Sequence, residues 1–454
     1  MQWLKYLVPT ATVLGLVIAY DAPPRPNIVP FPKTPTRPLP VSPLRDPSKV
    51  CIVCHKTTGD SAPAILKAAH DCNDGGTVVF LPGATYTIAS RVDLTFLKHI
   101  DFAILGTIVF SDDVKYWQTN TFAYRYQNVN LMWRFGGEDV NIYGLGQGTI
   151  DGLGQTWWNA NVANSTVVRP LLLGTDGLKG GSITGLNMRN SPNWFNIISN
   201  SSDILISDMN LTVEVTNKTS PAKVSYPPLS TSDSYTANGN DIKNTDGWDT
   251  YRSDNIIIQN SIIDNTDDCV SFKPNSTNVL VQGLRCNGSH GVSVGSLGQY
   301  QGQVDIVENL YIYNISMSNA SDGARIKIWP GVPPGTTGSE AGGGLGYVRN
   351  VTYDKYENKN NDWAIQLTQC YFAASQEACR KYPATLVIED IVFKDFTGTT
   401  SKKNDPRVGS LICSDPSVCK NIQAYDINIS PPSGKPAKWT CTNMDNSLLD
   451  IDCI

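Results

Sequence analysis

The sequence predicts an all-β protein, a right-handed parallel β-helix with a short helix that caps its N-terminal end. Short β-rich segments recur along most of the chain, and where they lie closest a repeat is roughly 20–30 residues long. Asn, Gly, Ser, Thr, Val and Ile dominate over helix-forming residues, which agrees with strands and turns. Strands this short cannot bury a face alone, so each coil must stack on the next. A propeller and a sandwich fit the pattern less well.

The recurring segments share one pattern, in which a polar turn residue precedes and follows a run of β-branched apolar residues. The clearest copies are residues 203–208, 255–260, 278–283 and 309–314, and further copies begin at Asn141, Asn350 and Glu389. The step from Asn255 to Asn278 is the length of one short repeat, and later steps are longer. The sequence therefore predicts a solenoid with insertions on one side.

The N-terminal region divides into parts of different composition. Residues 1–20 show the charged start, apolar run and small residues of a secretion signal, and the run is too short to favour a membrane span. Residues 21–47 contain ten prolines and almost no periodic apolar pattern, which predicts an extended and unpacked linker or pro-segment. In the predicted β-helix domain, residues 48–454, a short helix is predicted around 61–70, with Ser61 as its cap.

Two further features agree with export to the extracellular space. The chain has 11 cysteines, and sequence proximity predicts the disulfides Cys269–Cys286, Cys370–Cys379, Cys413–Cys419 and Cys441–Cys453, with Cys72 bound to Cys51 or Cys54. Glycosylation motifs occur at Asn164, Asn200, Asn210, Asn217, Asn275, Asn287, Asn314, Asn319, Asn350 and Asn428. We therefore expect a secreted glycoprotein.

The charge balance excludes some classes of partner. Lys plus Arg is 36 and Asp plus Glu is 41, which gives a net charge of −5, whereas nucleic-acid binding usually requires a basic face. No Cys or His spacing resembles a zinc site, and nothing in the sequence indicates an oligomer interface. We expect a monomer without metal, cofactor, nucleic acid or membrane partner. An anionic substrate would have to be held by a few placed cations.

Three acidic positions and one histidine recur at a constant spacing. Asp268 stands midway in sequence between Asp246 and His290, while Asp267 adjoins this middle position. Each of the two equal steps has the length of one short solenoid repeat. In a solenoid with coils of that length, these residues project from equivalent positions on successive coils, about 4.8 Å apart. The spacing therefore predicts one column of three aspartates and a histidine on one face.

A crowded carboxylate column is suited to acid–base hydrolysis. Because close carboxylates cannot all ionise easily, one keeps a proton that it can donate to a glycosidic oxygen, while another accepts a proton from water. The alternatives are a ladder of turn aspartates and a calcium site built from the same oxygens. Three aspartates in register with the nearby histidine favour the catalytic interpretation.

The next coil adds two cations. Arg325 and Lys327 alternate with Ile326, so both charged side chains are predicted on one face of a strand. Because arginine can bind a carboxylate at two points, this pair suits a carboxylated sugar beside the acidic column. The alternative is a solvated charged strand.

Together these residues resemble the family 28 glycoside hydrolases, the polygalacturonase family. The matching motifs are Asn244-Thr245-Asp246, Asp267-Asp268-Cys269, Ser289-His290-Gly291 and Arg325-Ile326-Lys327, in the family's order and spacing. The resemblance runs from about Asp46 to the C-terminus, and the stretches that begin at Asp268 and Ser289 look closest to the fungal exo-acting branch. The chain departs from the family at Thr266, where Gly is usual, and at Ser289, which replaces the first Gly of Gly-His-Gly.

The resemblance implies a parallel β-helix that hydrolyses galacturonan with inversion. It makes Asp267 the general acid, and Asp246 and Asp268 the groups that activate water. It gives His290 the role of tuning how the acid shares its proton. The substrate-binding residues that it implies are Asn244, Arg325, Lys327 and Tyr371.

The resemblance also favours homogalacturonan, because the rhamnogalacturonan-cleaving branch lacks the histidine that stands here as His290. Long loops at 216–240 and 330–346 can wall off an open groove and leave a pocket for a chain end. Trp248 and Trp329 lie next to the motifs and either stack on sugar rings or pack in the core. We expect a hydrolase that releases galacturonate from the non-reducing end of pectin.

Four alternatives stay open. The first two are an endo-acting polygalacturonase and a xylogalacturonan hydrolase. A pectate lyase would use Arg325 or Lys327 as its base, require calcium and leave an unsaturated sugar. A non-catalytic pectin-binding solenoid would need an open aromatic face and no carboxylates at fixed register. The column of carboxylates with a histidine favours hydrolysis over the lyase and over the binding solenoid.

Overall fold

The computed structural model describes residues 22–454 except 56–57, 125, 218, 223 and 225–240. The secretion signal predicted at residues 1–20 and most of the predicted loop 216–240 lie outside the described residues. Among the described helices, none is both long and apolar enough to cross a membrane.

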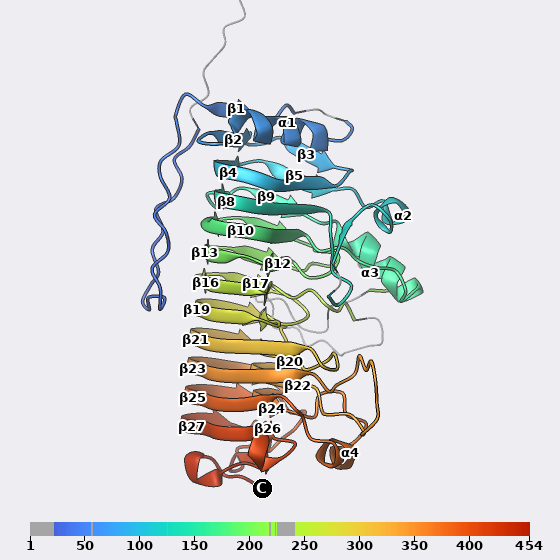
Figure 1. Cartoon of the computed structure of the whole chain (residues 1–454), viewed down its shortest axis with the longest axis vertical. Coiled ribbons are helices and arrows are strands. Elements are labelled where there is room, and N and C mark those ends of the chain that lie inside the picture. Colours follow the sequence, from blue (N-terminus) through green and yellow to red (C-terminus); the bar gives the residue numbers. More distant parts are fainter. Residues whose placement is uncertain (1–21, 56–57, 125, 218, 223, 225–240) are drawn as a thin grey trace, which may run out of the picture.

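In the described part of the chain, twenty-six strands form one continuous sheet that coils around a single long axis (Figure 1). The pairings within this sheet are parallel, and they run in three stacks along the axis, so the predicted parallel β-helix is confirmed. Shorter loops join the strands within a coil, while insertions with helices project on one side. Apolar side chains from all three stacks fill the interior along the whole length.

The stack that carries the candidate site, called the site stack here, contains β12 (Asn196–Ser199), β15 (Trp248–Tyr251), β18 (Val270–Phe272), β20 (Val292–Leu297), β22 (Asp322–Ile328), β24 (Trp363–Thr368), β26 (Arg407–Ile412) and β28 (Lys438–Thr442). The outer stack contains β1 (Val50–Ile52), β2 (Thr77–Phe80), β13 (Ser202–Ser207) and β16 (Ser253–Gln259). The third stack contains β3 (Thr85–Ile88), β5 (Thr107–Phe110), β9 (Thr149–Asp151), β11 (Asn187–Arg189), β14 (Asn210–Thr212) and β17 (Ile262–Asp264).

Longer strands bend from one stack into another. The strands that join the site stack to the outer stack are β4 (Val92–Ile104), β8 (Trp133–Tyr143) and β10 (Leu173–Thr184). Those that join the outer stack to the third stack are β19 (Ser276–Asn287), β21 (Val304–Ser318), β23 (Leu345–Asn361), β25 (Val387–Thr400) and β27 (Cys419–Ser430). The predicted repeats lie in these strands and in β13 and β16.

Elements outside the coiled sheet are short. The described helices are α1 (Ala62–Cys72), α2 (Val114–Trp117), α3 (Gly154–Ala163) and α4 (Gln376–Lys381), with 3-10 turns at Pro416–Val418 and Asn446–Leu448. A separate antiparallel hairpin pairs β6 (Phe122–Ala123) with β7 (Asn130–Leu131). This hairpin belongs to an insertion beside the site stack.

The polar residue that opens each repeat lies at a corner of the coil, and three asparagines show why it is needed there. Asn278, Asn309 and Asn350 all adopt positive φ angles of 54–60°, a conformation that asparagine tolerates better than most residues. The side-chain amide of Asn309 donates to Asn278 at 3.1 Å, and that of Asn350 donates to Asn309 at 2.8 Å. The corner residues therefore turn the chain and also tie neighbouring coils together.

The predicted capping helix is confirmed as α1, which covers the first coil (Figure 1). Ser61 occupies the cap position but makes no side-chain cap bond; Asp60 accepts the hydrogen bond from the backbone N–H of Ala62 instead, at 3.0 Å. The four disulfides predicted from sequence proximity are confirmed, and Cys72 pairs with Cys51. Cys54 is a free, exposed thiol.

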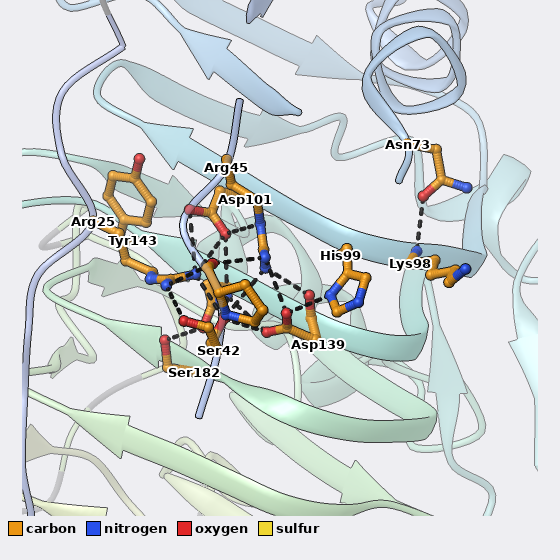
Figure 2. A network of polar contacts seen from close by, with 12 residues as sticks. Arg25, Ser42, Arg45, Asn73, Lys98, His99, Asp101, Asp139, Tyr143 and Ser182 are labelled. Atoms are coloured by element: carbon orange, nitrogen blue, oxygen red, sulfur yellow. Dashed lines mark hydrogen bonds and ion pairs between the residues drawn. The ribbon is translucent and has the colours of Figure 1, made fainter. Parts of the chain in front are cut away.

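The proline-rich segment, described here for residues 22–47 and called the strap, is extended as predicted but is not unpacked. It runs down and back along the outer stack (Figure 1). At its two ends, Arg25 and Arg45 both reach the buried carboxylate of Asp101, at 3.1 and 2.9 Å (Figure 2). Arg45 also lies 3.0 Å from Asp139. The strap is therefore anchored by buried ion pairs.

Farther along, glutamine side chains of the outer stack bind the strap backbone. Gln259 accepts from the backbone N–H of Phe31 at 3.3 Å and donates to the carbonyl of Val29 at 3.0 Å. Gln282 accepts from the backbone N–H of Lys33 at 3.0 Å and donates to the carbonyl of Lys33 at 3.2 Å. These amides substitute for a neighbouring strand, because they satisfy both backbone groups of an extended chain.

We expect Arg45→Met to lower the free energy of unfolding by about 3 kcal/mol, because the substitution removes a partner from the buried Asp101 carboxylate. Arg37→Met is the control from the same strap. Arg37 is half exposed where it pairs with Asp203 and Asp254, so its loss should cost only about 0.5 kcal/mol. Denaturant unfolding measures both variants, and equal effects would contradict an anchoring role for Arg45.

Candidate active site

The candidate site forms where the chain enters three successive strands of the site stack. The predicted residues that precede these strands are Asp246 before β15, Asp267 and Asp268 before β18, and His290 before β20. Trp248 pairs with Val270, and Val270 with Val292, so the constant spacing of the predicted residues is kept between coils. The coil length therefore brings the predicted column together.

The three aspartates form the cluster that their spacing predicted. One oxygen of each lies within 4.8 Å of an oxygen of the other two. Asp246 and Asp268 are buried, whereas 14% of the Asp267 side chain is exposed to the cavity. Close and buried carboxylates cannot all carry charge, so the cluster retains at least one proton.

Asp267 is held as an anion by the groups around it. Its Oδ1 accepts from the backbone N–H of Asp268 at 2.9 Å and lies 3.1 Å from His290 Nδ1. Burial opposes ionisation, but the charge and hydrogen bond of His290 lower the pKa of Asp267 overall. Burial likewise opposes the charge on His290, and Asp267 raises the pKa of His290 overall. In the free site these two residues therefore form an ion pair.

The surroundings of Asp246 favour its protonated form instead. Burial, followed by the negative charges of Asp267 and Asp249, raises the pKa of Asp246 well above its usual range. Its Oδ1 has no hydrogen-bond partner among the described residues. The opposite shifts place the retained proton on Asp246 before substrate binds.

Both predicted cations point to the cavity, with Ile326 between them in the core, as the strand alternation predicted. Lys327 is bound to Asp268, with 2.5 Å between Nζ and Oδ2. Arg325 donates from Nε to Gln366 at 3.1 Å and lies 3.6 Å from Asp322. Lys327 is thus engaged by the cluster itself, whereas the Arg325 guanidinium keeps donors that face the cavity.

Aromatic residues form one rim. Tyr371 lies 5.7 Å from Trp329 and 4.4 Å from Phe372, measured between ring centroids, and the Arg325 guanidinium lies 5.8 Å from the Tyr371 ring. Trp329 lines the cavity. Trp248 is fully buried, so of the two interpretations considered for it, core packing is the correct one.

Asn244 and Thr266 support the cluster from its edge. The backbone N–H of Asn244 donates to Asp267 Oδ2 at 3.2 Å, and its side-chain oxygen accepts from Arg169 at 3.0 Å. Thr266, at the position where Gly was expected, is buried, and its hydroxyl lies 2.7 Å from the Thr245 hydroxyl. The hydroxyl pair links two coils below the carboxylates.

The site residues line one cavity of about 840 Å³. Further wall residues come from the β6–β7 insertion, the loop after β20 and the loop before β23: Tyr124, Gln127, Asn128, Gln299, Tyr300 and Glu340. Gln127 donates to Gln299 at 3.1 Å, which joins two loops from distant parts of the chain. Glu340 lies in the predicted loop 330–346. The β6–β7 insertion was not predicted, because its residues show no periodic pattern.

Four buried residues around the cluster were not predicted from the sequence: Arg169, Trp194, Asp249 and Lys273. Asp249 stands shortly after Asp246, and Lys273 comes directly after β18. Their closeness to the motifs in sequence could have identified both residues. Arg169 and Trp194 enter from earlier coils. Their proximity depends on tertiary structure alone.

Comparison with known proteins agrees with this geometry. The sequence profile of the glycosyl hydrolases family 28 matches residues 95–449. Exopolygalacturonase A of Aspergillus niger is 55% identical over 444 residues, which cover 97% of each chain. Exopolygalacturonase X-2 of Emericella nidulans is 48% identical over 431 residues, 94% of this chain and 91% of that protein.

Among solved structures, endo-xylogalacturonan hydrolase from Aspergillus tubingensis matches with a TM-score of 0.75 and 31% identity, covering 89% of this chain and 98% of that one. A hyperthermoactive exopolygalacturonase from Thermotoga maritima shares the fold, with a TM-score of 0.58 and 15% identity over 86% of this chain and 90% of that one. The chain therefore belongs to the glycosyl hydrolases family 28.

Proposed function

We propose that this chain is a secreted, exo-acting hydrolase that releases galacturonate from the non-reducing end of homogalacturonan by inverting hydrolysis of α-1,4 bonds. The observation that carries the proposal is the cluster of three aspartates, with His290 and two cations, inside one cavity. The relatives of 48% and 55% identity that are named exopolygalacturonases support the substrate and the exo mode.

Asp267 acts as the general acid, and Asp246 and Asp268 activate water. Because Asp246 holds the proton in the free site, that proton must pass to Asp267 before cleavage. A galacturonate carboxylate entering near Asp267 disfavours a second anion there, so substrate binding drives the transfer. Protonated Asp267 then gives its proton to the leaving glycosidic oxygen, while ionised Asp246 and Asp268 hold the attacking water and Asp246 takes its proton.

The two cations divide the work of binding and catalysis. Arg325 can present two donors to the substrate carboxylate, and Tyr371 lies beside it at the rim. Lys327 is the partner of Asp268, so it holds a proposed base in place and contributes positive charge to the cavity. His290 keeps Asp267 oriented through the 3.1 Å contact of its Nδ1.

The exo mode is supported by the loops that surround the cavity. Gln127 and Gln299 connect the β6–β7 insertion with the loop after β20. Tyr126 stacks on Tyr251 at 4.3 Å, which fixes the same insertion against the site stack. Such a wall limits how far a polymer can extend past the cluster and favours binding of a chain end.

An endo-acting hydrolase of branched pectin is the second candidate. The observation that favours it is the 31% identity to endo-xylogalacturonan hydrolase over most of both chains. The higher identity to proteins named exopolygalacturonases favours the first candidate. Secretion and a monomeric state complete the proposal; the five disulfides support an oxidising, extracellular location.

End-product analysis on de-esterified polygalacturonate separates the candidates. We expect free monogalacturonate as the main product, with viscosity falling slowly as reducing ends appear, because only chain ends enter the cavity. Proton NMR should show the product first as the β-anomer, as inversion requires. A rapid loss of viscosity with mixed oligomers would favour endo action, and unsaturated products would indicate a lyase.

We expect Asp267→Asn to reduce turnover at least about 1000-fold, because the amide cannot donate the acid's proton. The thermal unfolding midpoint should stay near that of the parent. Asp426→Asn, at an exposed corner of β27, is the matched control and should leave turnover unchanged. More than a tenth of the parent activity in Asp267→Asn would contradict the assignment of the acid.

Arg325→Met and Lys327→Met should have different kinetic effects. Arg325→Met should mainly raise KM, because the guanidinium binds the substrate carboxylate. Lys327→Met should mainly lower kcat, because Asp268 loses its ion-pair partner. Steady-state kinetics on trigalacturonate measures both, and identical changes in KM and kcat would refute this division of roles.

A further inference from the structure

Lys273 lies under the carboxylate cluster but has no part in the roles described above. It follows β18 directly, and its side chain is 5% exposed. Its Nζ is 3.5 Å from Asp246 Oδ2 and 3.8 Å from Asp249 Oδ2. A buried ammonium needs compensation of its charge, and these two carboxyl groups are the ones within reach.

Asp249 is unusual because it is fully buried and neither of its oxygens has a hydrogen-bond partner among the described residues. Burial, opposed by the charge of Lys273, raises the pKa of Asp249 to about 8. One oxygen of Asp246 is also without a partner among these residues. The Lys273 ammonium is thus placed between two carboxyl groups that lack the usual hydrogen bonds of buried groups.

Lys327 and Asp268 form a second lysine–carboxylate pair in the site. Phe272 pairs with Val294, and Gly295 pairs with Lys327, so Lys273 and Lys327 occupy equivalent positions two coils apart. Gly295 lies between them without a side chain. Lys327 binds Asp268, and Lys273 approaches Asp246, so each carboxylate proposed to activate water faces its own lysine.

An aromatic ring holds Lys273 in this position. Its Nζ lies 4.6 Å from the centre of the Trp194 ring, within the range of a cation–π interaction. Trp194 belongs to the cavity wall as well. The ammonium therefore has aromatic contact on one side and the two carboxyl groups nearby, which limits the orientations that it can adopt.

Other charged or titratable groups also act on the Asp246–Lys273 pair. Those that act on it directly are Tyr126, Arg169, Asp249, Asp267 and Asp268, while His290 and Lys327 act on Asp267. Asp249, Asp267 and Asp268 disfavour an anion at Asp246, whereas Lys273 favours one. Lys273 is therefore the close cation that opposes the three neighbouring acidic groups.

We propose that Lys273 is a positioning residue for hydrolysis, which holds the Asp246 carboxylate ionised and oriented at the moment when it must accept a proton from water. When the proton passes from Asp246 to Asp267, Lys273 stabilises the charge that appears on Asp246. Asp249 keeps the ammonium centred below the cluster. This inference rests on the proposed function of the same site.

The test is the pH dependence of kcat/KM for Lys273→Met on trigalacturonate. Lys273 favours ionised Asp246, so its removal raises the pKa of Asp246. Because Asp246 holds the retained proton in the free enzyme, loss of that proton sets the basic limb of the profile, which should move to higher pH by about 1 unit. We expect kcat to fall about 100-fold while KM changes less than about threefold, with Lys273→Arg recovering most of the rate.

Lys394→Met is the matched control, because it removes a partly buried lysine that pairs with Asp354 at 3.3 Å, in the outer stack. It should leave the basic limb in place. If Lys273 only stabilises the fold, Lys273→Met will lower the unfolding midpoint without moving the limb. A folded Lys273→Met variant with the parent's basic limb would overturn the proposal.

Lys273→Gln decides the matter if Lys273→Met does not fold. Glutamine keeps a polar head group below the cluster but carries no charge, so it separates the loss of the cation from the loss of a polar partner. The basic limb should again move to higher pH, and an unmoved or oppositely moved limb would refute the proposal. Parent enzyme without galacturonan hydrolysis would instead refute the proposed function, so the two failures are distinguishable.

Discussion

A constant coil length is the constraint on which the site depends. From Trp248 through Val270 to Val292 the strands pair in parallel, and each coil advances the chain by the same number of residues. Side chains in a strand alternate between faces, so a slip of one residue in any of these coils would turn a site residue into the core. The apolar interior penalises such a slip, and the packing of the core therefore fixes the positions of the catalytic candidates.

The same stacking made much of the protein predictable from its sequence. The β-helix, the capping helix, the disulfides and the cluster of Asp246, Asp267 and Asp268 all follow from local pattern or from spacing. Such features are predictable because adjacent coils convert a difference in residue number into a distance. The roles of the individual residues do not follow in this way, since they depend on where protons and substrate lie.

Features that join distant segments could not be predicted. The ten prolines of the strap indicated an extended chain, but nothing local indicated that Gln259 and Gln282 would bind its backbone. The contact of Gln127 with Gln299 spans two insertions that follow no repeat. Lys327 lies on the predicted face and lines the cavity, but its contact with Asp268 was not predicted, because the sequence could place its face but not its partner.

The charges of the site explain how an acidic protein can hold an acidic sugar. The chain has a net charge of −5, so its overall field repels galacturonate. Around the cluster, burial raises the pKa of both Asp246 and Asp249, which lowers the negative charge of the site.

Lys327 is paired with Asp268, and His290 with Asp267, so those charges offset one another. Arg325 then adds a guanidinium to the cavity wall, beside the Tyr371 ring. In the mechanism proposed above, an anionic substrate binds this guanidinium, and its arrival moves the proton from Asp246 to Asp267. Substrate binding and preparation of the acid are one electrostatic event in that mechanism, because the charge of the sugar acts on the ionisation of the cluster.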